Sequence, residues 1–440
     1  MVTSSTSVWG RGGVPIAATA LVLFAMPLAQ VASFPDGHLL RWAVVWAAAC
    51  VASIWLLRRG SLRFDWVDAA AAALFLWLAA SILWSPDQKL GREAMTGIGP
   101  ALLLFLILRR IDVARLIHVG APIAIIGTLL ALLLGYRHGG MGNPNFLVEF
   151  LAVMTPLCWG TSRGVMVSLI GIGILLTMPS SLLAPLVVAA WAISWFLLTL
   201  REIRSWKVIA ATLGLVLVGL IIVSQLLDAR LGIESRADLW LSTSAAWFDR
   251  PWFGWGLGSF NYVIPAYGNV ALGIAPYSVE SATFPGAAHN DLLQLAMQGG
   301  LVGLMIAAVG IWMVLRRSSG PARIALLTFL ALAMVGFPFQ NPAALMGVIL
   351  AAAWAVGPPR SRSSGVPTRI VGLPLAAVCL ILLAGVPTRI VSEGHFSATH
   401  RYLGTGIVDQ EAAGLTGLYH ANEAYKRTPW RFETRLALFQ

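Results

Sequence analysis

The residues best suited to chemistry lie in one polar segment, residues 236–303, of a chain that is otherwise mostly apolar. His289 has an ordinary pKa of about 6.5, so its imidazole can accept a proton from an attacking hydroxyl at neutral pH. Arg236 carries a guanidinium that stays charged and can bind two phosphate oxygens at once. The two residues therefore suit transfer of a group from a phosphate-containing donor to a hydroxyl. His289 could instead only orient the acceptor, and Arg236 could pair with Glu234 or Asp238.

Further polar residues are candidates for binding a substrate. Asp291, Gln294 and Gln298 are spaced so that they share one face of a helix. Such a face at membrane depth either lines a cavity or forms hydrogen bonds with a neighbouring helix. Asn143 and Asn145, at the start of an upstream span, either cap that span or contact the substrate. Glu149, one turn later, either pairs with a nearby arginine or backbone group or takes part in the chemistry. The predicted substrate-binding set is Arg250, Lys89, Arg92, Asn143, Asn145, Asn290, Asp291 and Gln294.

Composition places the chain among polytopic membrane proteins. Hydrophobic residues make up 58% of it, charged residues only 11%, and the mean hydropathy is +0.79, which excludes an ordinary soluble domain. The net charge of +11 would suit a nucleic-acid-binding protein, but basic residues in a membrane protein usually mark its orientation. Cys50, Cys158 and Cys379 each lie in a hydrophobic run, so we expect neither a disulfide nor a metal site from them.

The hydrophobic runs predict an all-α fold with about 12–13 membrane-spanning helices, since a span needs about 20 mainly apolar residues. The first run is long and only weakly basic at its start, so we interpret it as a retained anchor and not as a signal peptide. The predicted spans are 14–33, 39–57, 66–84, 93–108, 113–134, 146–160, 164–178, 180–200, 208–227, 290–315, 322–337, 343–357 and 371–390.

Lys and Arg residues predict which side of the membrane each loop faces. With the N-terminus in the cytoplasm, most of them fall at cytoplasmic ends, and the short loops opposite hold only Arg41, Lys89, Arg92 and Arg137. The positive charge is then mainly a topological signal, which excludes a nucleic-acid partner. The predicted divisions are N-terminal spans at 1–227, a large external loop at 228–289, C-terminal spans at 290–391 and an external helical tail at 392–440. The tail is either part of a helical repeat or an amphipathic surface helix.

Glycines in the large loop predict a tight turn. Gly254, Gly256 and Gly258 follow Pro251 at alternate positions. A nucleotide-binding loop would need a strand before it and a helix after it in a βαβ unit, which the surrounding sequence does not supply. Glycine allows a positive φ and a close approach of backbones. A structural turn is therefore expected, with direct substrate contact as the alternative.

The motifs also follow a recognisable order along the predicted topology. They are Gly142-Asn143-Pro144-Asn145-Phe146 at the start of one span, Arg236 with Trp240, Asp249 before Pro251, the glycine turn ending at Phe260, and His289-Asn290 at the start of another span. This order resembles the O-antigen ligase and Wzy polymerase superfamily.

The resemblance implies a GT-C-like, inverting enzyme of the bacterial inner membrane, with its active site facing the periplasm. The implied reaction moves a glycan from an undecaprenyl diphosphate-linked donor to an acceptor hydroxyl among membrane lipids, without nucleotide sugar, ATP, metal or other cofactor. It assigns the diphosphate to Arg236 and catalysis to His289. The implied acceptor is lipid A-core; the alternatives are a glycan acceptor, as in Wzy-type polymerisation, or a protein hydroxyl, as in protein O-oligosaccharyltransferases.

One position departs from the family pattern. Many members carry a Ser-Arg pair where this chain has Ser180-Ser181, so another cation such as Arg92 or Arg250 would have to take that role. A flippase for lipid-linked oligosaccharides, or another transporter, is an alternative from a different class. Such a protein would be expected to concentrate polar residues within its spans and not in one external loop.

Overall fold

The computed structural model describes residues 38–57, 61–136, 143–160, 162–176, 233–267 and 287–359, together with short pieces at 141, 187, 191, 366–367, 376–377, 379–381 and 383–384. The described part is helical, apart from a two-residue antiparallel pairing of β1 (Ser61–Leu62) with β2 (Val366–Pro367). The predicted spans 14–33, 180–200, 208–227 and most of 371–390 lie outside the described residues, as do Ser180, Ser181 and the tail 392–440.

Helices occupy the predicted spans that the structure describes, and two further helices lie within the predicted large loop. The helices are α2 (His38–Leu57), α3 (Trp66–Ser81) with the short turn η1 (Ile82–Trp84), α4 (Gln88–Leu108), α5 (Val113–Leu133), α6 (Pro144–Leu157) with η3 (Cys158–Gly160), α7 (Ser162–Leu176), α10 (Ile233–Asp249), α11 (Phe260–Tyr267), α12 (Asp291–Arg317), α13 (Gly320–Ala333) and α14 (Pro342–Val356).

Several of these helices are suited to crossing a membrane. Among the described residues, four are long and apolar enough, namely 66–84, 88–108, 113–133 and 291–317, and shorter apolar helices accompany them. Large apolar side chains on their outer faces are more than half exposed, for example Leu76, Met166 and Met305. Such surface is unfavourable in water and favourable against lipid. The chain is therefore an integral membrane protein with several spans.

Capping residues explain where the helices begin. Asp65, Asp87 and Asp112 accept backbone N–H groups at the starts of α3, α4 and α5. Asn143 and Asn341 do the same for α6 and α14, each followed by a proline in the first helical turn. The expected cap at Asn143 is thus confirmed.

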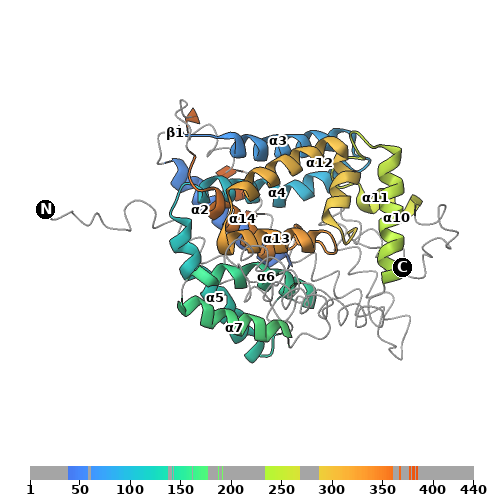
Figure 1. The fold of residues 1–440 in the computed structure, drawn as a ribbon. Coiled ribbons are helices and arrows are strands. Elements are labelled where there is room, and N and C mark those ends of the chain that lie inside the picture. The colour runs from blue at the N-terminus through green and yellow to red at the C-terminus, as the bar shows by residue number, and fades with distance from the viewer. Residues whose placement is uncertain are drawn as a thin grey trace, which may run out of the picture.

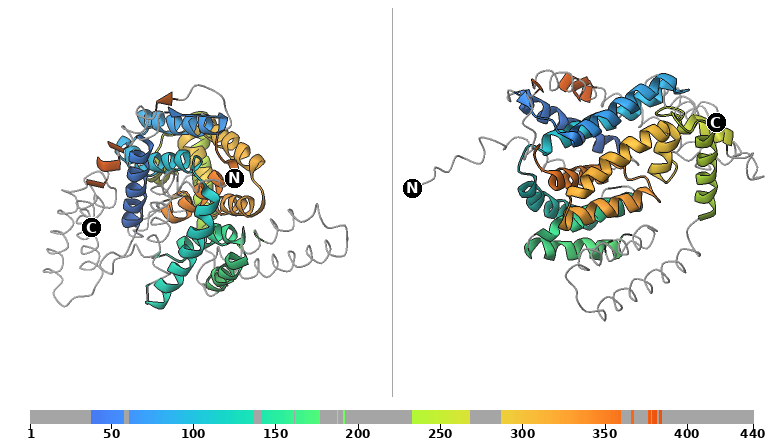
Figure 2. Two further views of the ribbon diagram at one scale, coloured as in Figure 1. Left: turned by 90° about the vertical axis from the view of Figure 1, so that its left-hand side faces the viewer. Right: turned by 45° about the horizontal axis from the view of Figure 1, so that its top comes forward.

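The described spans pack into a bundle with a helix across one end. α3, α4, α12, α13 and α14 lie side by side, while α10 stands across the end at which α3 finishes and α14 begins (Figures 1 and 2). The main core joins α2, α4, α5, α6, α13 and α14, and small residues let the helices approach closely: Gly347 leaves no room for a Cβ, which would lie 2.9 Å from Val153. A smaller core joins α10 and α11 to α12.

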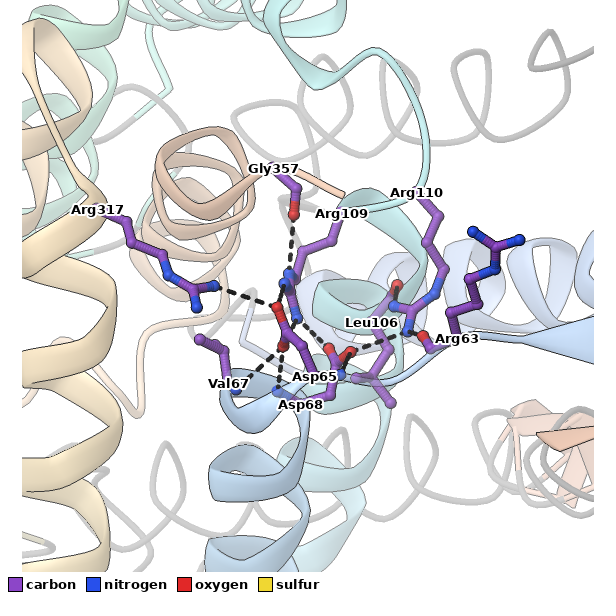
Figure 3. A network of polar contacts seen from close by, with 9 residues as sticks. All are labelled: Arg63, Asp65, Val67, Asp68, Leu106, Arg109, Arg110, Arg317 and Gly357. Atoms are coloured by element: carbon purple, nitrogen blue, oxygen red, sulfur yellow. Dashed lines mark hydrogen bonds and ion pairs between the residues drawn. The ribbon is translucent and has the colours of Figure 1, made fainter. Parts of the chain in front are cut away.

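An ionic network ties the helices together at the other end of the bundle (Figure 3). Arg109, at the end of α4, is 0% exposed and binds Asp65 through both terminal nitrogens at 2.8 and 3.1 Å. It also pairs with the buried Asp68 of α3 and donates its Nε hydrogen to the carbonyl of Gly357 after α14, at 3.2 Å. One guanidinium therefore holds the ends of α3, α4 and α14.

Two further arginines complete the network from its rim. Arg110 lies 3.0 Å from Asp68, and Arg317, at the end of α12, lies 3.1 Å from Asp65. Burial alone would raise the pKa of Asp65, but hydrogen bonds from Arg109 and the backbone of Asp68, with the charge of Arg109, lower it to about 2. Because this pKa is lower than in the unfolded chain, the stabilisation is present above pH about 4 and is lost as pH falls towards 2.

The position of Arg41 differs from the prediction, which placed it in a short external loop. It lies in the first turn of α2 and its side chain is 0% exposed. The helix begins before the hydrophobic run, so the first turn carries this arginine into the bundle.

Replacement of Arg109 by Met should lower the free energy of unfolding by about 3–5 kcal/mol, because it leaves two buried carboxylates without their partner. Arg317→Met is the matched control: its side chain is 43% exposed, so water already screens the pair and the loss should stay below about 1 kcal/mol. Thermal unfolding in detergent, followed by tryptophan fluorescence, measures both. Equal losses would show that Arg109 is not the central member of the network.

Candidate functional site

The candidate site depends on a bend in α12, the helix that follows His289. Gly300 has φ 67° and ψ −174°, which is not helical, and Figure 1 shows the helix changing direction near its start. A bend of this kind removes intrahelical partners from the backbone groups on either side of it. At membrane depth those groups need other partners.

The turn at residues 251–258 supplies these partners. Its backbone hydrogen bonds with the bend are Trp255 N to Met297 O (2.9 Å), Gly256 N to Gln298 O (2.8 Å), Leu301 N to Pro251 O (2.7 Å) and Val302 N to Trp252 O (3.2 Å). The indole of Trp77 on α3 donates to the carbonyl of Gly299 at 2.8 Å. The turn therefore stabilises the bend and sets the direction of the first segment of α12.

Glycine is required in this turn for two reasons. Gly254, Gly256 and Gly258 have φ values of 68°, 92° and 80°, which side chains disfavour. A Cβ atom would also lie 2.6 Å from Gln298 O at position 254, 2.5 Å from Ser81 O at position 256 and 2.3 Å from Gly91 N at position 258. The predicted tight turn with positive φ is confirmed, and its contacts are with the protein's own backbone.

Several candidate residues contact the segment between α13 and α14, residues 335–341. The carbonyl of Val335 accepts a hydrogen bond from Arg236 at 3.2 Å, and the ring of Phe337 packs edge-on against His289 with centroids 4.8 Å apart. Asp291 accepts the backbone N–H of Phe339 at 2.8 Å. This segment, the 335–341 turn, therefore brings α10 and the start of α12 together.

Amide side chains extend the same arrangement to α6. Gln340 donates to Asp291 at 3.4 Å and to Gln294 at 3.3 Å. The fully buried Asn341 donates at 3.0 Å both to the carbonyl of Phe146 and to the carboxyl of Glu149, which is 1% exposed. Glu149 thus holds the 335–341 turn through the amide of Asn341.

His289 adopts a strained backbone conformation. Its φ of 51° is the one positive value recorded for a residue other than glycine in the described part of the chain, and it costs about 1–2 kcal/mol. Its neighbours hold it there. Ala288 donates its N–H to Gln294 Oε1 (2.9 Å) and accepts the indole hydrogen of Trp240 (3.0 Å), while Asn290 caps α12 by accepting the N–H of Leu293 (2.9 Å). The residues around His289 therefore fix the position of its imidazole.

Burial and charge keep the imidazole neutral. The ring is half-buried; burial and then the charge of Arg236 lower the pKa of His289 from 6.5 to about 4. Arg236 is itself half-buried, and burial lowers its pKa, though an arginine stays charged. A neutral imidazole can accept a proton, and a guanidinium beside it can attract an anion.

A cavity of about 760 Å³ lies beside the start of α12, and neither His289 nor Arg236 is among its lining residues. Asp291, Gln294 and Gln298 all line it, as the helical spacing allowed, and Gln340 lines it too. Asp291 and Gln294 also bond to the 335–341 turn and to Ala288, so the role of lining a cavity is confirmed, and these hydrogen bonds go to segments between helices.

The remaining predicted cations do not share this location. Lys89 and Arg92 are exposed on the first turns of α4, which pack against the glycine turn. Arg250 is exposed, with its guanidinium 4.0 Å from the ring centroid of Trp255. Asn143 and Asn145 are at the start of α6, where Asn143 accepts the N–H of Asn145 at 2.8 Å. The side chains of Glu234 and Asp238, the alternative partners of Arg236, lie outside the described residues.

Three residues that meet here were not singled out from the sequence: Phe337, Gln340 and Asn341. A signal was present, because Asn341-Pro342 repeats the Asn143-Pro144 pattern of a capped helix start. What the pattern lacks is any indication that the two helix starts adjoin.

Comparisons with known proteins give no family for this chain. No protein-family profile matches it, and no curated protein is similar to it. The family resemblance therefore rests on the motifs and their order.

Gly256→Ala should detach the turn from the bend, since its Cβ would lie 2.5 Å from Ser81 O on a backbone with positive φ. We expect a loss of stability of about 1–3 kcal/mol or more, and faster proteolysis between residues 250 and 260. Gly173→Ala on α7 is the control: a Cβ there has nothing within 4 Å, and alanine should stabilise a helix by about 0.5–1 kcal/mol. A Gly256→Ala protein as stable and protease-resistant as wild type would contradict this role of the turn.

Proposed function

We propose that this protein is a membrane-embedded glycan transferase that moves a glycan from a polyprenyl diphosphate, with undecaprenyl diphosphate as the expected carrier, to an acceptor hydroxyl. It would be a member of the O-antigen ligase and Wzy polymerase superfamily, acting at the periplasmic face of a bacterial inner membrane. Lipid A-core is the first candidate acceptor, and a glycan or a protein hydroxyl are the others.

The observation that carries this proposal is the strained His289 next to Arg236. A positive φ on a residue other than glycine persists only where its surroundings impose it, and here Ala288, Asn290 and Phe337 do so. The cation, Arg236, and the base, His289, come from two sequence motifs that lie more than fifty positions apart. The arrangement gives a physical reason for both motifs.

The reaction of a diphosphate-linked donor requires few further groups in the site. A diphosphate is a good leaving group, so the protein must stabilise its charge and direct the acceptor hydroxyl. Arg236 would bind the diphosphate as the bond between glycan and phosphate breaks. His289 would take the proton from the hydroxyl as the new glycosidic bond forms, and the undecaprenyl diphosphate would leave with its charge held by Arg236.

Reconstituted protein tests the reaction directly. We expect wild type, supplied with an undecaprenyl diphosphate-linked glycan and candidate acceptors, to transfer the glycan and release undecaprenyl diphosphate. His289→Ala and Arg236→Ala should each lose about a hundredfold in rate, or about 2.7 kcal/mol of transition-state stabilisation. Arg163→Ala, which removes an exposed cation on α7, is the control and should retain most of the rate. Movement of the donor across the bilayer without consumption would replace this proposal with a transporter.

The pH dependence gives an independent check. Because the pKa of His289 is lowered to about 4, the neutral base is present above that pH, and kcat/KM, which reports the free enzyme, should fall only as pH drops towards 4. A diphosphate bound next to the ring adds negative charge and should raise this pKa. The acid limb of kcat should therefore lie at higher pH than that of kcat/KM. Coincident limbs near pH 6.5 would show that His289 is neither buried nor next to the bound diphosphate.

A further inference from the structure

The cavity beside the candidate site extends along the spans. Its walls come from α2, α3, α4, α12, α13 and α14, and it follows α12 from Asp291 in the first turn to Leu315 in the last. Its volume of about 760 Å³ is within the range of specific ligand sites. A long space between membrane spans has the shape of an extended hydrocarbon chain.

Side chains divide this cavity into an apolar length and a polar end. Small and apolar residues such as Ala70, Leu74 and Ile311 line most of it. Most polar lining residues lie where the glycine turn and the 335–341 turn meet α12, namely Asn261, Asp291, Gln294, Gln298 and Gln340. Glu93 and Thr96 line the cavity from α4. A ligand that matches both parts has a hydrocarbon chain and a polar head.

The polar end selects the kind of head. The residues that line the cavity include two carboxylates and several amides, but among the described lining residues no Lys, Arg or His. Carboxylates oppose a phosphate, whereas carboxylates and amides both bind hydroxyl groups. The buried Oδ1 of Asn261 accepts no hydrogen bond from a described residue, so a hydroxyl donor there would relieve an unfavourable desolvated acceptor.

We propose that this cavity binds the hydrocarbon chain of a glycolipid with an uncharged, hydroxyl-rich head, and that the head lies at Asn261, Asp291 and Gln298. The role of this lipid rests on the proposed function: it would be the acceptor, and it fits the glycan acceptor named there better than lipid A-core, whose phosphates the carboxylates would oppose. Asp291 and Gln294 line the cavity and also bind the segments on either side of His289. A head at this end therefore lies against residues that hold His289 in place, while the donor diphosphate stays with Arg236.

Photolabelling tests the cavity without requiring turnover. The protein in lipid nanodiscs is treated with an alkyl glucoside that carries a diazirine at the end of its chain, and labelled peptides are identified by mass spectrometry. We expect labelling of α3 and α12. Gly310→Phe and Ala70→Phe fill the cavity where α3 and α12 meet, since a Cβ at position 310 would lie 3.8 Å from that of Ala70, and should each reduce labelling about tenfold or more.

Gly173→Phe is the matched control, because Gly173 is exposed on α7 with open space around it, and its labelling should equal that of wild type. An alkyl phosphate with the same chain should label α3 and α12 much less. Unchanged labelling in both filled variants, or equal labelling by the phosphate, overturns the proposal. His289→Ala should label normally. Labelling without any glycan transfer by wild type would remove the proposed function and leave the lipid site, and transfer without labelling would do the reverse.

Discussion

The bend of α12 at Gly300 is the constraint on which the rest of the candidate site depends. A bent helix inside a membrane protein leaves backbone groups without intrahelical partners, and lipid offers them none. The turn at 251–258 satisfies them by placing its own backbone directly on the bend. Only glycine permits that approach, because a Cβ at position 254, 256 or 258 would overlap neighbouring backbone atoms. The turn at 251–258 and the span are therefore one structural unit.

The direction of the first segment of α12 then decides where the polar side chains go. Asp291 and Gln294 face both the cavity and the 335–341 turn, so that turn is held by a carboxylate and two amides and, from α6, by Glu149 through Asn341. Phe337 packs against His289 as a consequence. Buried polar networks of this kind are favourable only when their members are satisfied together. The position of the imidazole thus depends on α6, α10, α12 and the 335–341 turn as well as on its own neighbours in the chain.

Ion pairs hold the helices together at the opposite end of the bundle. Arg109 binds two carboxylates at the start of α3 and the carbonyl that follows α14, and Arg317 adds α12. The same four helices line much of the cavity. Ion pairs with full burial contribute chiefly by penalising any separation of their partners. The helices are fixed to one another at this end, while at the other end polar side chains line the cavity.

Much of the architecture follows from the sequence. Hydrophobic runs predicted the described spans to within a few residues, except that α4 begins at Gln88 and α13 ends at Ala333, because Asp87 caps one helix and 335–341 forms a turn. Periodicity and local chemistry also predicted the glycine turn, the cap at Asn143 and the shared face of Asp291, Gln294 and Gln298. Each of these depends on residues close together in the chain.

Tertiary structure decided which of the candidates meet. Arg236 and His289 share one place, whereas Lys89, Arg92 and Arg250 are exposed elsewhere, although sequence put all of them on one side of the predicted membrane. Phe337, Gln340 and Asn341 entered the site only because α6, α12 and the 335–341 turn pack together. Local patterns determine helices and turns, since these form from neighbouring residues. Contacts between helix ends depend on packing across the whole bundle, which no short stretch of sequence encodes.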